Sequence, residues 1–185
     1  MRLARLAGSG AAFASALMLV ACAARAPAPV SLGLKLAPAA IGASFSVQQH
    51  LTVERGGRTD ELDAALEVDA LRLDLVGLAL GQRVLSIHYD GSRLTEWRHP
   101  MLPSQVRADA VLQDLQLTLW PLAALRAALP PGWQVSDDGL RRTLIHDNGV
   151  VATVSYSGMP RWSGTVVLDN LRYHYRLTIL SAPES

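Results

Sequence analysis

Residues 44–68, SFSVQQHLTVERGGRTDELDAALEV, decide the fold class of this chain. Gly56 and Gly57 divide the stretch into two halves, and apolar residues occupy alternate positions in each half. The apolar positions are Phe45, Val47, Leu51 and Val53 in the first half, and Leu62, Ala64, Leu66 and Val68 in the second. Successive side chains of a strand point to opposite faces, so this period indicates two half-buried strands. The glycines suit a tight turn, and the stretch therefore predicts an antiparallel hairpin.

The same alternation returns along much of the chain. After a one-residue phase slip, which is typical of a bulge or a bend between two strands, it predicts strands at 71–75, 85–89, 94–99, 133–136, 140–146, 150–156, 165–168 and 173–180. Asp90-Gly91 and Asn148-Gly149 are strong turn signals between alternating runs. Turns spaced about 8–12 residues apart favour one antiparallel sheet.

Two helices are predicted in the middle of the chain. Pro100 and Pro103 interrupt the strand pattern, Ser104 suits the N-cap of a helix over 104–117, and Pro121 suits the first turn of a helix that ends near residue 129. Strands precede and follow this insertion. We therefore expect an α+β fold: a curved antiparallel sheet, or half-barrel, whose concave face is covered by the two helices.

The N-terminus has the three zones of a secretory signal peptide. Arg2 and Arg5 are basic, residues 6–18 are apolar or small, and Leu-Val-Ala precedes Cys22, the only cysteine of the chain. The apolar run is shorter than the about 20 residues that span a bilayer, so a permanent transmembrane helix is the weaker alternative. The sequence around Cys22 resembles the lipobox of bacterial lipoproteins. That resemblance implies cleavage before Cys22 and a lipid on its thiol, whereas the alternative is a secreted protein with a free thiol.

The domain organisation follows from this assignment. Residues 1–21 are the signal peptide, residues 22–43 are the lipidated cysteine and a tether with an irregular apolar part at 32–40, and residues 44–185 form a single domain. More than one acyl chain would make the membrane anchor effectively stable. Ala23, rather than the aspartate associated with inner-membrane retention in enteric bacteria, favours the outer membrane, facing the periplasm.

The charge of the mature chain excludes one class of partner. The chain has 17 basic and 16 acidic residues, and loss of Arg2 and Arg5 leaves 15 against 16, a net charge of about −1. Such a surface has no basic excess to hold a phosphate backbone, so we expect no nucleic-acid partner. A single cysteine also excludes an intramolecular disulfide.

The sequence contains no motif that predicts an enzyme. It has no Gly-x-Ser-x-Gly nucleophile elbow, and its histidines, His50, His88, His99, His146 and His174, are scattered singly without metal-ligand spacing. The acidic group Asp60, Glu61 and Asp63 lies beside a turn and is expected to be solvated. Asp114 and Gln116 stand in an apolar stretch and are expected to bond helix ends or strand edges if buried. We expect no catalytic residue, no cofactor and no metal.

Two resemblances bear on function. The block at 102–133, with the lipobox and the closing segment 173–179, resembles a family of uncharacterised proteobacterial lipoproteins that are often encoded among aryl-polyene biosynthesis genes. That family has no settled biochemical role. The order of strands, helices and strands is similar to the lipoprotein carrier fold of LolA and LolB, in which an incomplete barrel lidded by helices holds acyl chains.

A ligand site of this kind would lie between the sheet and the helices. Half of the residues are hydrophobic and few are aromatic, so its walls would be rich in leucine. The candidate ligand-binding residues are Leu73, Leu75, Leu85, Ile87, Leu115, Leu119, Trp120, Tyr173 and Tyr175. The alternative is that these side chains simply fill a core.

Three functions remain open from the sequence. The first is an outer-membrane lipoprotein that binds or transfers a hydrophobic acyl-type ligand, with aryl-polyene lipid as one candidate. The second is a non-catalytic scaffold lipoprotein that recruits a protein complex of the envelope through an exposed sheet edge; its protein partner is unknown. A periplasmic hydrolase is a distant third.

Overall fold

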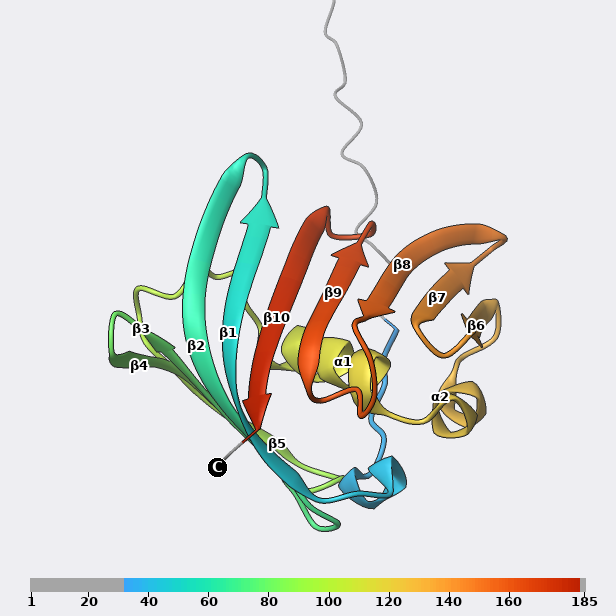
Figure 1. Cartoon of the computed structure of the whole chain (residues 1–185), viewed down its shortest axis with the longest axis horizontal. Coiled ribbons are helices and arrows are strands. Elements are labelled where there is room, and N and C mark those ends of the chain that lie inside the picture. Colours follow the sequence, from blue (N-terminus) through green and yellow to red (C-terminus); the bar gives the residue numbers. More distant parts are fainter. Residues whose placement is uncertain (1–31, 184–185) are drawn as a thin grey trace, which may run out of the picture.

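The computed structural model of the chain describes residues 32–183, which form one curved antiparallel sheet and a small helical layer (Figure 1). The strands are β1 (Phe45–Arg55), β2 (Arg58–Val68), β3 (Leu73–Ala79), β4 (Gln82–Tyr89), β5 (Leu94–Arg98), β6 (Trp133–Asp137), β7 (Arg141–His146), β8 (Gly149–Tyr156), β9 (Gly164–Asn170) and β10 (Tyr175–Pro183). Their order in the sheet is β5-β4-β3-β2-β1-β10-β9-β8-β7-β6. The helices are α1 (Ala108–Leu119), α2 (Leu122–Ala128) and the short 3-10 helix η1 (Pro38–Ile41). The α+β class and the open half-barrel are confirmed.

The first hairpin has the predicted register. Arg55 pairs with Arg58 and Phe45 with Val68, so Gly56 and Gly57 alone form the turn. Both glycines have positive φ angles, 57° and 77°, which a two-residue turn that follows the twist of the strands requires. Most inward positions of both strands are apolar, with the buried Gln49 of β1 as a polar exception, and the outward positions are mostly polar. The alternation therefore fixed the pairing as well as the existence of these strands.

The phase slip after residue 68 marks a turn between two strands. The carboxylate of Asp69 accepts hydrogen bonds from the backbone N–H groups of Leu71 (2.7 Å) and Arg72 (2.9 Å). These bonds lower the pKa of Asp69. The chain reverses here, and β3 returns along β2 with Leu73 opposite Val68.

The predicted start of the first helix was wrong. Ser104 does not cap it: α1 begins at Ala108, and its N-cap residue Arg107 makes no side-chain capping bond. The guanidinium of Arg98 donates to the carbonyls of Leu102 (3.1 Å) and Pro103 (2.9 Å), which holds the segment around Ser104 in a turn. Helical backbone can therefore start only after this loop.

The last strand begins later than predicted. Residues 171–174 form the turn between β9 and β10, and His174 has a positive φ of 54°. The side chain of Asn170 accepts a hydrogen bond from the N–H of Tyr173 (3.3 Å) and so closes this turn. Tyr173 thus lies in the turn, and β10 starts at Tyr175.

The segment before the sheet belongs to the core. Residues 32–37, here called the strap, are extended, and η1 follows them; this range lies within the tether assigned from sequence. Leu32 and Leu34 are 1% and 3% exposed and share one hydrophobic cluster with the inward side chains of the sheet. The structure therefore adds part of the tether to the domain.

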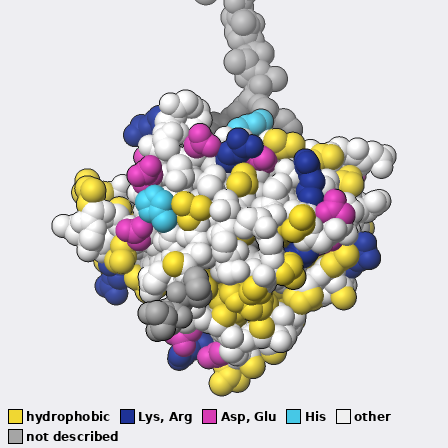
Figure 2. Space-filling model, in the orientation of Figure 1, with side chains coloured by type: hydrophobic (Ala, Val, Ile, Leu, Met, Phe, Trp, Pro, Cys, Tyr) yellow, Lys and Arg dark blue, Asp and Glu magenta, His cyan; other side chains and the backbone are white. Residues whose placement is uncertain are grey.

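The surface and the composition of the described residues limit the kinds of site. Basic and acidic side chains are interspersed over the face shown in Figure 2. Within residues 32–183 no helix is long and apolar enough to cross a membrane, and no group of three or more His, Cys, Asp or Glu could hold a metal ion. The signal peptide and Cys22 lie outside the described residues, so their assignment stays a prediction.

Candidate functional site on the concave face

The candidate ligand-binding residues come mainly from the concave side of the sheet and from α1. Seven of them are buried in the core: Leu73, Leu75, Leu85, Ile87, Leu115, Leu119 and Trp120. Tyr175 is half-buried at the start of β10, and Tyr173 is half-buried in the preceding turn, outside the sheet. The structure brings eight of the nine to one apolar interior, where they pack as core residues. Their role in ligand binding stays a prediction.

The strap is held against α1 by side chains of the helix. Gln116, which is fully buried, accepts a hydrogen bond from the N–H of Leu36 (3.1 Å) and donates one to its carbonyl (2.9 Å). The indole N–H of Trp120 donates to the carbonyl of Ala37 (3.1 Å), and Gln113 accepts from the N–H of Gly33 (3.1 Å). Residues 113, 116 and 120 lie three and four apart, on one side of the helix. The strap therefore runs parallel to α1.

The C-terminal end of α1 is fixed by β7 and β8. Arg142, which is 1% exposed, donates to the carbonyls of Leu117 and Thr118, and the Tyr156 hydroxyl donates to the Thr118 carbonyl (2.7 Å). These carbonyls belong to the last turn, which has no partners within the helix. Burial of Arg142 lowers its pKa. One charged side chain and one hydroxyl side chain of the sheet thus satisfy the free carbonyls at the end of the helix.

A carboxylate balances the charge of Arg142. Asp137 on β6 accepts from Arg142 (2.9 Å) and from Arg161 (two contacts of 2.7 Å). Burial opposes ionisation of Asp137, but bonds from Arg161, the Gly139 N–H and Arg142 outweigh it and hold the pKa well below its usual range. Asp137 is therefore a carboxylate at all physiological pH values, which suits a structural ion pair rather than proton transfer.

The middle of α1 carries a second polar contact with the sheet, at Asp114. The Tyr175 hydroxyl donates to the carboxyl group of Asp114, and the Asn170 amide donates to it more weakly (3.4 Å). Burial raises the pKa of Asp114 to about 6, although bonds from Tyr175 and Asn170 and the charge of Arg172 oppose the rise. Asp114 is thus the one described carboxyl group with a pKa raised toward neutrality. It bonds strand side chains rather than the helix ends or strand edges that we expected.

The concave face is closed in this conformation. The two best-formed hollows of the described residues lie elsewhere: one of about 310 Å³ is bordered by α2 and β6, with Arg126, Leu129 and Trp133, and one of about 250 Å³ lies on the outer face of β3, β4 and β5. The interior between the sheet, α1 and the strap is filled by side chains. A ligand can enter it only if α1 or the strap moves.

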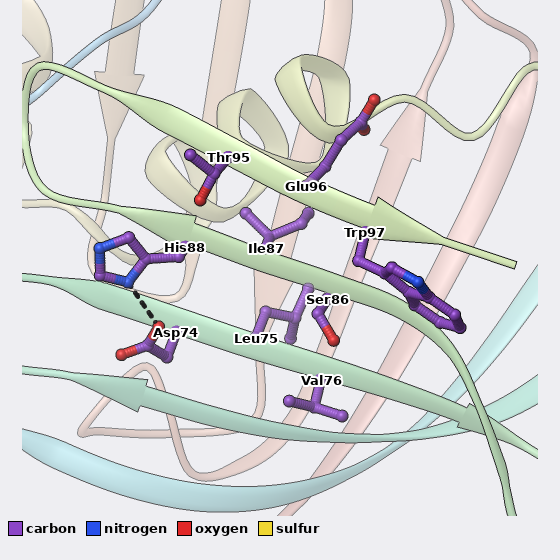
Figure 3. A pocket seen from close by; sticks show the side chains of 9 residues that line it. All are labelled: Asp74, Leu75, Val76, Ser86, Ile87, His88, Thr95, Glu96 and Trp97. Carbon is purple, nitrogen blue, oxygen red and sulfur yellow. Dashed lines mark hydrogen bonds and ion pairs between the residues drawn. The ribbon is translucent and has the colours of Figure 1, made fainter.

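The outer-face hollow combines apolar and polar walls. Val76, Ser86 and Trp97 come from three adjacent strands and point to the same face, together with His88 and Asp74 (Figure 3). Trp97 is 41% exposed, and the Ser86 hydroxyl oxygen is buried without a hydrogen-bond partner among the described residues. Because β5 is an edge strand, this hollow lies at one end of the strand order.

The described histidines give no catalytic constellation. His88 bonds Asp74 (2.7 Å) and His50 bonds Asp63 (2.9 Å), and all four side chains stand on the outer, polar face of the sheet. In Figure 3 the His88 ring is turned toward Asp74 and away from Ser86, so these three residues do not form a nucleophile–base pair. Asp60, Glu61 and Asp63 are exposed, as predicted.

Sequence reasoning missed two parts of the interior. The strap was assigned to the tether, although Leu32, Leu34 and Leu36 already show the period of two. Arg142 was not singled out, although it occupies the same parity as Leu144 in the alternating pattern of β7. A basic residue at an inward position was the available signal for a buried ion pair.

Comparisons with known proteins identify the family to which this chain belongs. Among solved structures, the chain is similar to a DUF1329 family protein from Desulfovibrio piger, which is 11% identical, with 77% of this chain and 85% of that chain covered at a TM-score of 0.35. No curated protein sequence matches this chain. The profile of the family described as "Protein of unknown function (DUF3261)" matches residues 46–183, which include α1, α2 and all of the sheet except its first residue, Phe45. This chain belongs to the DUF3261 family.

Proposed function

We propose that the protein is an outer-membrane lipoprotein, anchored through Cys22 and facing the periplasm, that binds and transfers a lipid acyl chain. Aryl-polyene lipid is the candidate cargo that the family resemblance suggests. The observation that carries the proposal is that the strap, which covers part of the concave face, can be detached without breaking the sheet. An apolar interior is covered there by α1 and the strap, and the strap is attached to α1 through a small set of side-chain bonds rather than through the ladders of the sheet.

The turn between β3 and β4 supports contact with a lipid surface. Leu80 is fully exposed at its tip and has a positive φ of 51°, next to Gly81 at 75°. A two-residue turn of this type favours Asn-Gly, because most L-residues are strained at positive φ. A leucine in this place is unfavourable in water both for its backbone and for its exposure. An apolar surface outside the protein would offset part of this cost.

The chain enters the domain at the same end of the sheet. Gly33 bonds Gln113, and the next helix residue, Asp114, bonds Tyr175 beside the turn between β9 and β10. Since the strands alternate in direction, that turn and the turn at Leu80 lie at one end of the sheet (Figure 1). An anchor that precedes the strap would therefore bring Leu80 toward the membrane.

Leu80→Ser is expected to slow lipid transfer about tenfold, since burial of a leucine side chain contributes about 1.5 kcal/mol or more. The measurement uses the lipidated full-length protein in acceptor vesicles and a fluorescent acyl lipid in donor vesicles. The matched control is Leu71→Ser: Leu71 is 78% exposed in the turn between β2 and β3, at the opposite end of the sheet. Equal rates for both variants would refute the role of Leu80, and no transfer by the wild type above protein-free vesicles would refute the carrier function.

The outer-face hollow favours a second candidate, a scaffold lipoprotein. An extended peptide added beside β5 would pair with the free edge of that strand and cover Trp97. Here the partner would be a protein strand, and no lipid would enter the interior.

Trp97→Ala separates this candidate from the carrier. If the scaffold is correct, cross-linking in cells yields a defined protein adduct that Trp97→Ala reduces at least about tenfold, because aromatic residues dominate interface energies. Leu180→Ala is the control, since Leu180 is 49% exposed but lies on β10, in the middle of the sheet. Cross-links to lipid alone, unchanged by Trp97→Ala, would argue against the scaffold.

A further inference from the structure

The strap is bound as a separable chain. Its residues take no part in the ladders of the described ten-stranded sheet. The bonds that hold its backbone come from Gln113, Gln116 and Trp120. Removal of the strap from its groove would therefore break bonds with one helix and leave every strand pairing intact.

The part of the strap that enters the interior is aliphatic. Leu32 and Leu34 are almost fully buried, and Leu36 packs against the same core. Three leucine side chains bring about twelve aliphatic carbons into the interior, comparable to one medium-length acyl chain. The leucine side chains that fill the groove along α1 thus match an acyl chain in volume and in apolar character.

We propose that this groove is the binding site for one lipid acyl chain, and that the acyl chain enters it by displacing the strap. The inference rests on the proposed carrier function and deepens it, because it names the residues that the ligand replaces. It also explains how an interior without an open cavity can take a ligand. The strap and the acyl chain are then alternative occupants of the same groove.

The polar side of the groove restricts the ligand further. Displacement of the strap leaves the fully buried Gln116 amide and the Trp120 N–H without the carbonyls of Leu36 and Ala37. A buried polar group without a partner is costly. The ligand must therefore present a hydrogen-bond acceptor beside its alkyl chain, and the carbonyl of a fatty-acid ester or amide matches the backbone carbonyls that it would replace.

The test uses the mature chain with Cys22→Ser, which lacks only the lipid, and 1-monolauroylglycerol as the probe. Hydrogen exchange of the strap amides, measured with and without the probe, reports directly on displacement. Protection at Gly33 and Leu36 is expected to fall when the probe binds, while the strands keep theirs. Binding with unchanged or increased strap protection would overturn the displacement and leave the carrier function standing.

Affinity measurements supply a second readout. Leu34→Ser weakens the strap and is expected to tighten probe binding about tenfold, because a larger fraction of the protein is then open. Lys35→Ser, at the exposed neighbouring position, should leave the affinity unchanged. If neither the wild type nor the folded Leu34→Ser variant binds the probe, the carrier function itself is overturned. If Leu34→Ser binds the probe with the same affinity as Lys35→Ser, only the strap site is overturned.

A comparison of two lipids that differ only in the carbonyl tests whether the ligand needs this group. 1-O-dodecylglycerol has an ether where 1-monolauroylglycerol has an ester, and it is expected to bind about tenfold more weakly because Gln116 and Trp120 lose the carbonyl acceptor and keep only a weaker ether oxygen. Equal affinity of the two lipids would remove the carbonyl from the proposed ligand.

Discussion

Replacing Arg142 with methionine is expected to lower the free energy of unfolding by about 3 kcal/mol, the larger of the two effects argued here. Methionine keeps much of the aliphatic volume of arginine, so the loss reports on polar contacts. The variant leaves Asp137 with one fewer cation and leaves the carbonyls of Leu117 and Thr118 without their donor. Breaking a buried ion pair costs more than the pair contributes, because the remaining groups stay desolvated.

Arg141 offers a matched control for this measurement. It precedes Arg142 on β7 but points outward and is exposed. Arg141→Met is expected to change the stability by less than about 0.5 kcal/mol in urea unfolding. If Arg142→Met also stays within that range, the polar end of α1 contributes nothing measurable and its attachment rests on apolar packing.

Asp114 is expected to make the protein less stable as the pH rises from about 4 to 8. Its pKa is about 6 in the folded protein against an ordinary value of 3.8, so between these values the folded state holds a proton that the unfolded chain releases. The stability from this group is fully present below pH 3.8 and is lost as the pH rises through 6. Since Asp114 keeps some contact with solvent, we expect a loss of about 2 kcal/mol.

Asp114→Asn tests this sign. The variant cannot ionise, so it should be more stable than the wild type at pH 8 and should lose that advantage at about pH 4.5. Asp109→Asn, at an exposed position of the same helix, should leave the pH dependence of unfolding unchanged. Asp137 has the opposite effect: because its pKa is lowered in the folded protein, its contribution to stability is lost only as the pH falls into the acidic range. A wild type and an Asp114→Asn variant with parallel profiles would refute the assignment.

The parts of the fold that depend on neighbouring residues were predictable. The turn between β7 and β8 lies one residue earlier than the predicted Asn148-Gly149, at Asp147 and Asn148, and the period of two placed the apolar faces of β1 and β2 inward. Both are local patterns: a turn needs particular backbone angles, and a half-buried strand needs alternation. The start of α1 was missed because Arg98, several residues earlier, holds the loop carbonyls. That bond joins two elements and leaves no local signal.

The candidate site divides in the same way. The sequence predicted an interior rich in leucine, facing two helices, and it named residues of β3, β4 and α1 that do meet there. It could not tell that the strap also enters this interior. Gln116 and Leu36 are 80 residues apart, and their bonds exist only once α1 and the strap lie side by side.

By itself, then, the sequence determined the α+β class, the sheet and the position of the helical insertion, since alternation and turn residues act over a few positions. The tertiary structure decided that the concave face is closed, which polar groups hold α1, and that the strap fills the groove. These depend on which distant side chains meet in a low-dielectric interior, where each buried polar group must find a partner. The period of two recurs in Leu32, Leu34 and Leu36, and only the packing turns those three leucines into part of the core.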